Sequence, residues 1–311
     1  MVTFGVATNE NIDYDTLRRM WLEAERLGFD SAWLCDHLTL GGYCLEAWTA
    51  LSALSAETRH IRFGPMVLCN GFRNPAILAK MAASLDVISK GRLELGMGAG
   101  WYEPEYHAYN IPYPRTYARI RELREAVALI RKIWMEDKTT FQGKYYAVKD
   151  LVLDPKPVQK PHPRIWIGGF GEKFLLRTVA KLADGYILRR GATLEEWIHK
   201  MDVLKEHCKV VGRDFAEIRR AWVGPVFIGK TREEALFKLR TQTHPFRSRD
   251  KTPEHFAEES VVGTPAECAQ NMRKYIDAGA TDFIASFAGE ELRDLKGLRL
   301  FEQAMSILRG K

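Results

Sequence analysis

The 311-residue chain has too few cysteines, in the wrong arrangement, for a disulfide framework or a thiolate zinc site. Their number is odd, and no two of them form the Cys-x-x-Cys pair that is typical of such sites. The five are Cys35, Cys44, Cys69, Cys208 and Cys268. This pattern fits a reducing compartment, so we expect the protein to be cytoplasmic.

Long apolar runs and blocks of like charge are also missing. No segment reaches the about 18 apolar residues of a membrane span, and the N-terminus lacks a basic stretch followed by an apolar core. The net charge of +6 is spread along the chain, and its densest basic run, residues 115–132, is interleaved with glutamates at helical spacing. We interpret that run as the solvated face of a helix, with an anion-binding surface as the alternative. We expect no membrane or nucleic-acid partner, while the positive balance suits an anionic substrate or cofactor.

Several catalytic motifs are absent as well. There is no His-Glu-x-x-His and no cluster of acidic residues, and His199 and His207 lie too far apart to be read as a ligand pair. The Gly-x-Ser-x-Gly elbow and the phosphate-binding P-loop are also missing. We therefore expect no metal site and no activated serine.

What the sequence does have is a regular alternation of short apolar runs and helical patterns. It is 46% hydrophobic and 28% charged, which is typical of a globular protein with a large core. Eight runs read as buried strands: residues 3–7, 32–35, 61–68, 92–97, 164–167, 185–188, 221–228 and 282–287. Eight strands with intervening helices favour a closed (β/α)8 barrel, the TIM barrel, over an open doubly wound sheet. We therefore predict an α/β fold in which residues 1–311 form one barrel domain.

Two segments do not fit the repeating pattern. Residues 139–163 hold alternating aromatic residues and then four prolines, which predict a hairpin followed by a connector. Residues 244–263 are polar and predict a lid. A helix predicted over residues 13–27 ends at Gly28, while Thr264 and Glu267 predict a capping box at the start of the last helix.

Glycine gathers where one of the predicted strands ends. The run GRLELGMGAGWYEPEY, residues 91–106, places Gly96, Gly98 and Gly100 at that end. Glycine costs stability inside a strand, so the cluster indicates either the close approach of a flat ligand or a bulge or tight turn. Active sites of (β/α)8 barrels lie at the carboxyl ends of the strands, which favours the ligand.

A second glycine group follows the strand predicted over residues 164–167. Gly168, Gly169 and Gly171 let successive backbone N–H groups point at one spot, and a helix that begins near Glu172 adds a partial positive charge. Together these features bind phosphate. The alternative is a tight left-handed turn between strand and helix, and the carboxylate of Glu172 would compete with phosphate for the same amides.

One histidine stands out among the eight in the chain. His37 alone directly follows a buried strand run and lies next to a carboxylate, that of Asp36. Histidine titrates near neutral pH and can exchange a proton with a substrate, although a packed structural histidine is the alternative. Asp36 either orients His37 or, since successive strand residues face opposite sides, bonds to backbone or ligand. Glycines, aromatics and one histidine suit a planar phosphorylated cofactor better than a nucleophile.

At these strand ends the chain resembles the bacterial-luciferase-like oxidoreductases, and within them the branch that uses the deazaflavin coenzyme F420. The matching segments follow the family order: AERLGFDSAWLCDH, GFRNPAILAKMAASLDVISKGRLELGMGAGWYEPEY, YYAVKDLVLDPKPVQKPHPRIWIGGFGEK, RTVAKLADGYI and VGTPAECAQNMRKYIDAGATDFI. The resemblance implies a TIM barrel with the planar cofactor lying across the mouth formed by the strand ends. It also suggests a homodimer, and insertions after Phe141 and around His244 that shape the substrate pocket.

The resemblance further implies a role for each strand end. His37 is the implied catalytic residue, beside the reactive ring. The implied cofactor-binding residues are Asp36 beside the ring, Val67, Leu68 and Cys69 in a bulged strand behind it, Gly98, Ala99, Gly100 and Trp101 beneath it, and Gly168, Gly169, Phe170, Gly171 and Glu172 around the phosphate.

One position departs from part of that family. Related sugar-phosphate dehydrogenases have a glutamate directly after the glycine that aligns with Gly100, where this chain has Trp101, which argues against sugar-phosphate oxidation. The resemblance then predicts hydride transfer between F420 and a small organic substrate. The alternatives are an FMNH2-dependent two-component monooxygenase, with Trp101, Phe170 and Phe72 shielding its pocket, and a catalytically silent flavin or deazaflavin binder.

Overall fold

Strands and helices alternate as predicted in the computed structural model, which describes residues 2–8, 12–40, 42–188, 191–242, 252–287 and 289–310. Every pairing within the main sheet is parallel. Its strands are β1 Thr3–Thr8, β2 Ser31–Leu34, β3 Arg62–Pro65, β4 Leu68–Cys69, β5 Glu94–Gly98, β8 Arg164–Gly168, β9 Gly185–Ile187, β10 Arg219–Ile228, β11 Val261–Gly263 and β12 Asp282–Ser286. The predicted α/β class is confirmed.

The main sheet closes into a barrel. Its hydrogen-bonded order is β3-β2-β1-β12-β10-β9-β8-β5-β4, and β3 continues directly into β4 along the chain. Phe63 of β3 also forms a parallel bridge with Leu93, just before β5. β3 and β4 are therefore two halves of one strand, interrupted at Met66 and Val67, whose peptide bond is cis. With that interruption, the eight predicted strands are confirmed, and β11 is an additional strand beside β10.

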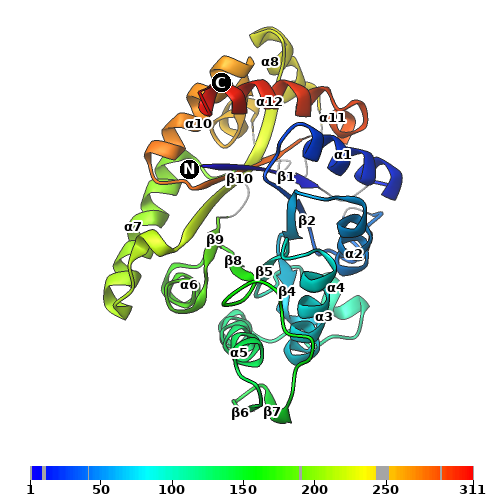
Figure 1. The fold of residues 1–311 in the computed structure, drawn as a ribbon. Helices are drawn as coiled ribbons and strands as arrows, with labels where there is room; N and C mark the ends of the chain where they lie inside the picture. The colour runs from blue at the N-terminus through cyan, green and yellow to red at the C-terminus, as the bar shows by residue number, and fades with distance from the viewer. Residues whose placement is uncertain are drawn as a thin grey trace.

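Helices surround the barrel (Figure 1). They are α1 Tyr14–Arg26, α2 Ala47–Glu57, α3 Pro75–Ile88, α4 Glu103–Ala108, α5 Thr116–Met135, α6 Arg177–Leu182, α7 Leu194–Val211, α8 Arg232–Thr241, α9 Pro253–Glu258, α10 Pro265–Asp277, α11 Gly289–Asp294 and α12 Lys296–Leu308, with short turns η1 Asn70–Phe72, η2 Glu172–Leu176 and η3 Phe215–Glu217. None of the helices in the described ranges is long and apolar enough to cross a membrane.

The predicted helix ends match the structure in most details. Gly28 follows α1 with a φ of +76°, a conformation that glycine adopts at little cost. The capping box of Thr264 and Glu267 is confirmed at the start of α10. The expectation that this is the last helix is wrong, because β12, α11 and α12 follow it.

The basic run predicted as a solvated helix face forms most of α5. One of its arginines is not solvated, because Arg119 is 6% exposed and its guanidinium lies 4.0 Å from the centre of the Tyr113 ring. Its Nε donates to the carbonyl of Gly100 at 3.3 Å. Arg119 therefore supports the loop after β5, which the pattern of charges alone did not indicate.

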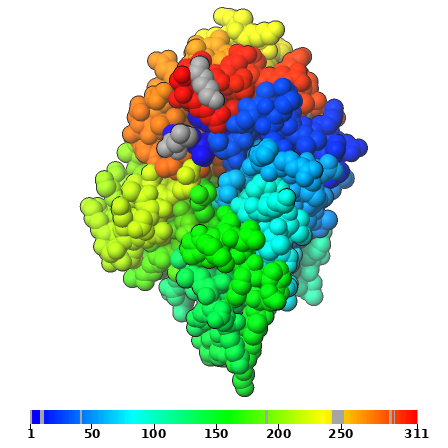
Figure 2. Space-filling view, viewed as in Figure 1, coloured from blue at the N-terminus to red at the C-terminus, as the bar shows by residue number. Residues whose placement is uncertain are grey.

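The first irregular segment is the hairpin that the sequence predicted. Strands β6 Thr139–Gln142 and β7 Ala147–Leu151 pair in antiparallel fashion and form the tapered tip in Figure 2. The hydroxyl of Tyr146 accepts a hydrogen bond of 3.0 Å from the Nδ2 of Asn70, which follows β4. The hairpin therefore reaches a strand end.

The structure describes only part of the second irregular segment, residues 244–263. Residues 243–251 lie outside the described residues, so the lid stays a prediction for that part of the segment. The remainder forms α9 and then β11, which pairs with β10. That part of the segment therefore extends the sheet.

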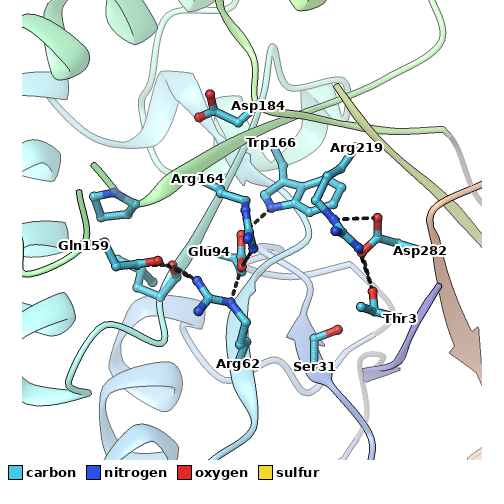
Figure 3. Close-up of polar contacts among 12 residues, drawn as sticks. Thr3, Ser31, Arg62, Glu94, Gln159, Arg164, Trp166, Asp184, Arg219 and Asp282 are labelled. Atoms are coloured by element: carbon cyan, nitrogen blue, oxygen red, sulfur yellow. Dashed lines mark hydrogen bonds and ion pairs between the residues drawn. The ribbon is translucent and has the colours of Figure 1, made fainter. Parts of the chain in front are cut away.

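A network of charged residues closes the barrel at the amino ends of the strands (Figure 3). Glu94 at the start of β5 is buried and accepts hydrogen bonds from the guanidinium of Arg62, from Arg164 at 2.8 Å and from the indole of Trp166 at 2.7 Å. Nearby, Arg219 pairs with Asp282 at 2.7 Å. This end of a TIM barrel serves stability, whereas the opposite end carries chemistry.

Candidate active site at the carboxyl ends of the strands

The ends of β2 and β5 bring a histidine and two aromatic residues together. The ring of His37, after β2, lies 5.7 Å from the ring of Trp101 and 6.2 Å from that of Tyr102, both edge to face. Trp101 is 64% exposed, which places this cluster at the surface of the barrel mouth. The family resemblance implied that His37 lies beside the cofactor ring and Trp101 beneath it, so both were expected at this end of the barrel.

The partner of His37 is Glu105 of α4. Nδ1 of His37 lies 3.1 Å from Oε2 of Glu105, and the side chains are 15% and 2% exposed. Burial by itself would raise the pKa of Glu105, but hydrogen bonds from the backbone at Thr39, from His37 and from the backbone at Leu38 outweigh burial and lower it. Glu105 is therefore a buried carboxylate in its ionised form.

Asp36 does not orient His37. Its carboxylate accepts two hydrogen bonds of 2.8 Å from the guanidinium of Arg73 and one of 2.8 Å from the backbone N–H of Cys69. Of the two roles that the sequence left open for Asp36, bonding to backbone is the observed one, because side chains of successive residues point to opposite sides. Arg73 also contacts Glu46, the N-cap residue of α2. Asp36 thus ties together the ends of β2 and β4.

Val67 forms the floor of the mouth. It packs, partly exposed, on the apolar residues that fill the barrel interior: Ala7, Trp33, Met66, Trp166, Ile187, Ala221, Val223 and Ile284. A Cβ atom on Gly98 or Gly168 would lie 2.6 Å or 2.8 Å from its methyl groups. These two glycines therefore make room for Val67, rather than leaving an open slot beside their own Cα atoms as expected for a ligand.

Gly100 likewise leaves room for protein atoms close to its Cα atom. Its φ is +77°, and a Cβ atom there would lie 2.0 Å from the hydroxyl of Tyr106 and 2.7 Å from the sulfur of Cys69. Those two groups lie 2.9 Å apart, and burial raises the pKa of Cys69 to about 11, so its thiol is not reactive. The glycine pattern correctly marked a crowded strand end, but protein atoms occupy the space beside Gly98 and Gly100.

At the end of β8, only some of the backbone amides in the predicted phosphate site are engaged by other groups. The backbone N–H of Gly169 donates to Ile187 at 3.3 Å, and its carbonyl accepts from the hydroxyl of Tyr186 at 2.9 Å. Gly169 therefore has no free amide for a phosphate. The next helical turn, η2, begins after Gly171 and has no side-chain cap, so its first N–H groups are available.

Glu172 does not compete for those amides. Its carboxylate contacts Lys200 of α7 and lies 3.0 Å from Nε2 of His199. The hydrogen bonds from Lys200 and His199 lower the pKa of Glu172. The Nζ of Lys200 also lies 3.8 Å from the ring centre of Phe170. Because the carboxylate is engaged on α7, it leaves the start of η2 open to an anion.

The chain is similar to known proteins of one family. The family model for luciferase-like monooxygenases matches residues 1–282. The chain belongs to this family. Among named relatives, the F420-dependent glucose-6-phosphate dehydrogenase of Kineococcus radiotolerans is 29% identical over 87% of this chain and 86% of its own. The enzyme of the same name from Amycolatopsis mediterranei is 27% identical over 87% of both chains.

Solved structures share the luciferase-like fold. An F420-dependent secondary alcohol dehydrogenase, in complex with an F420-acetone adduct, has a TM-score of 0.87 at 20% identity and covers 99% of both chains. The oxygenating constituent of 3,6-diketocamphane monooxygenase from Pseudomonas putida, in complex with FMN, has a TM-score of 0.80 at 18% identity and covers 100% of this chain and 98% of that one. At these identities the likeness concerns the fold alone.

The residues of this luciferase-like chain fit a planar phosphorylated cofactor. An uncapped helix start offers N–H donors to a phosphate, and the apolar, partly exposed Val67 offers a surface to a ring system. His37 offers a ring nitrogen at the same strand ends. Among the described residues, no group of three or more His, Cys, Asp or Glu side chains could hold a metal ion.

Sequence reasoning missed Glu105 and Arg73 in this luciferase-like site. Glu105 lies in the quoted run WYEPEY, but Glu103 stands two positions before it, and only the fold shows that Glu105 turns inward. Arg73 follows a strand end, which is the signal that could have found it. Its partner Asp36 was recognised, although with a different role.

Proposed function

We propose that this protein is an oxidoreductase that transfers a hydride between coenzyme F420 and a small organic substrate. The observation that carries the proposal is the pairing of His37 with Glu105 at the barrel mouth, 5.7 Å from the exposed indole of Trp101. The family and the F420-dependent names of the relatives support the choice of cofactor.

His37 is the residue that moves the proton. When bound, the deazaflavin supplies the carbon that accepts or donates the hydride. Nδ1 of His37 is engaged by Glu105, and no hydrogen bond from the described residues reaches Nε2. Nε2 therefore takes a proton from the substrate during its oxidation and returns it during reduction. The barrel end holds the reacting groups together, which supplies much of the rate enhancement.

Other residues at the mouth bind and orient. Val67, Leu68 and Cys69 back the ring, with Asp36 holding Cys69 in place through its backbone N–H. The residues from Gly98 to Trp101 form the adjacent edge. Gly171 and Glu172, at the start of η2, would hold the phosphate, with Gly168, Gly169 and Phe170 shaping the turn that leads there.

The substrate is not a sugar phosphate in this proposal, although the named relatives are glucose-6-phosphate dehydrogenases. The residue after Gly100 is Trp101, and its exposed indole presents an apolar wall beside His37. An apolar wall gives no hydrogen-bond acceptor to a sugar hydroxyl at that position.

The cofactor choice is tested by titrating the purified protein with F420 and with FMN in parallel, with binding followed by fluorescence. We expect F420 to bind more tightly.

Replacing Gly171 with Asp is expected to weaken F420 binding by about tenfold or more, because the new carboxylate caps the helix start and repels the phosphate. A Cβ at position 171 has only ordinary contacts, 3.6 Å from Leu175, so G171A isolates the effect of the added charge.

Tight binding of FMN with no binding of F420 would overturn this choice of cofactor. Oxygen uptake with enzymatically reduced FMN would then identify the two-component monooxygenase. If F420 binds but no substrate set is turned over, the silent binder is the better description.

We propose that the protein is a homodimer, with the outer face of α3 in the interface. Ile77 and Ile88 are 61% and 62% exposed, and Met81 lies between them on the same side of the helix. Light scattering after gel filtration is expected to give about twice the monomer mass, and replacing Ile77 and Ile88 with Glu is expected to give monomers. The control is Val210→Glu on α7, at a position that is 74% exposed. A wild-type monomer would contradict the proposal.

We also propose that the protein works in the cytoplasm on a small-molecule substrate. The odd number of cysteines and the lack of a Cys-x-x-Cys pair fit a reducing compartment. Dehydrogenase activity in the family supports a small-molecule substrate.

A further inference from the structure

The carboxylate of Glu105 contacts four groups of the segment that follows β2. Its Oε1 accepts three backbone N–H groups, from Leu38 at 2.7 Å, Thr39 at 2.8 Å and Leu40 at 3.1 Å. Its Oε2 faces Nδ1 of His37 at 3.1 Å. One side chain of α4 therefore holds both the ring of His37 and the three residues that follow it.

These partners fix the chemical state of the pair. A carboxylate that accepts three N–H groups on one oxygen is held ionised, and an ionised carboxylate is only an acceptor. Nδ1 of His37 must then carry the hydrogen in this contact. In the neutral ring the lone pair is consequently on Nε2.

The charged groups around the pair are engaged elsewhere. On the β2 and β4 side, Asp36 pairs with Arg73, and Arg73 also contacts Glu46. On α4 itself, Glu103 pairs with His107 at 3.1 Å. Among the described residues, Glu105 is therefore the one ionised group in direct contact with the His37 ring.

We propose that Glu105 is a positioning residue that holds His37 as the Nδ1–H tautomer and makes Nε2 the base of the reaction. The catalytic part of this inference rests on the function proposed above, whereas the tautomer does not. During substrate oxidation the proton goes to Nε2, and the carboxylate of Glu105 stabilises the resulting imidazolium without taking the proton itself. During reduction the same proton leaves from Nε2.

The tautomer is tested by nitrogen-15 NMR of the histidine rings in the wild-type protein without any cofactor. We expect neutral His37 to carry its hydrogen on Nδ1. In Glu105→Gln, the amide oxygen can still accept from the loop, while the NH2 group faces Nδ1, so we expect the hydrogen to move to Nε2. A wild-type ring with its hydrogen on Nε2 would overturn the inference, even if the variant fails to fold.

Glu103→Gln is the matched control. It makes the same change two positions away on α4, at a side chain that is 56% exposed and whose one ion-pair partner among the described residues is His107. We expect it to leave the His37 tautomer as it is in the wild type. Equal changes in both variants would count against a specific role of Glu105.

The catalytic consequence is measured with F420 and an accepted substrate. Glu105→Gln is expected to lower kcat by about 10²–10⁴-fold, with little change in KM, and to move the pH profile of kcat to lower pH. A tautomer switch with unchanged kcat would overturn the catalytic role. A tautomer switch in a protein that does not turn over F420 at all would confirm the pairing and instead count against the proposed function.

Discussion

Replacing His37 with alanine is expected to lower turnover of F420 by about 10²–10⁴-fold while the affinity for the cofactor stays nearly unchanged. The imidazole is held by Glu105 at the rim of the mouth and lies edge to face against Trp101, so its removal deletes the proton carrier without reshaping the floor formed by Val67. Stopped-flow absorbance of the deazaflavin measures the rate, and equilibrium titration measures the affinity.

Two further variants make this measurement decisive. His107→Ala removes an exposed histidine of α4 whose ion-pair partner is Glu103, so its rate should match that of the wild type. His37→Gln keeps a polar side chain but cannot carry the proton as imidazole does, so it should be as slow as the alanine variant. If His37→Ala turns over at the wild-type rate across a set of substrates, another residue is the catalyst.

Replacing Glu94 with alanine is expected to lower the free energy of unfolding by about 3 kcal/mol. The carboxylate is 3% exposed and is shared by the guanidinium groups of Arg62 and Arg164 and by the indole of Trp166. Its loss leaves the buried N–H of Trp166 without a partner, which by itself costs about 1–3 kcal/mol. The two arginines reach solvent and can be hydrated again, which keeps the total at the lower end of the range for buried pairs.

Denaturant-induced unfolding, followed by tryptophan fluorescence, measures this effect. The control is Glu57→Ala, because Glu57 pairs with Arg18 at the surface, where such pairs contribute about 0–1 kcal/mol. Glu94→Gln should lie between the two, since the amide oxygen can accept either from the two arginines or from the indole, whereas the carboxylate accepts from all three. Equal stability of Glu94→Ala and Glu57→Ala would mean that the network at the amino ends of the strands contributes little.

The sequence predicted the barrel because the strands are short apolar runs whose side chains are buried on both faces. The family resemblance implied a bulged strand at Val67, Leu68 and Cys69, and the strand is interrupted next to them, at Met66 and Val67. The run of residues 61–68 was nevertheless read as one strand, although Pro65, which cannot donate to a ladder, was a signal of the break. Residues 252–263 were also out of reach, because pairing of β11 with β10 depends on contacts distant in sequence.

The sequence predicted where the candidate site lies, but not which residues contact one another in it. The rule that chemistry lies at the strand ends was enough to select His37 and Trp101. It could not select Glu105, because a carboxylate on a short helix after β5 is indistinguishable by pattern from its exposed neighbour Glu103. Likewise, the glycines were correctly read as a sign of close approach, but pattern alone does not tell whether the approaching group is a ligand or Val67.

The fit of Val67 between Gly98 and Gly168 limits how this enzyme can be redesigned. Any side chain at either glycine would collide with the valine, so a single substitution at Gly98 or Gly168 cannot reshape the floor of the mouth. Trp101, by contrast, is largely free of such constraint. Directed evolution toward new substrates should therefore accumulate changes at the rim and leave the base as it is.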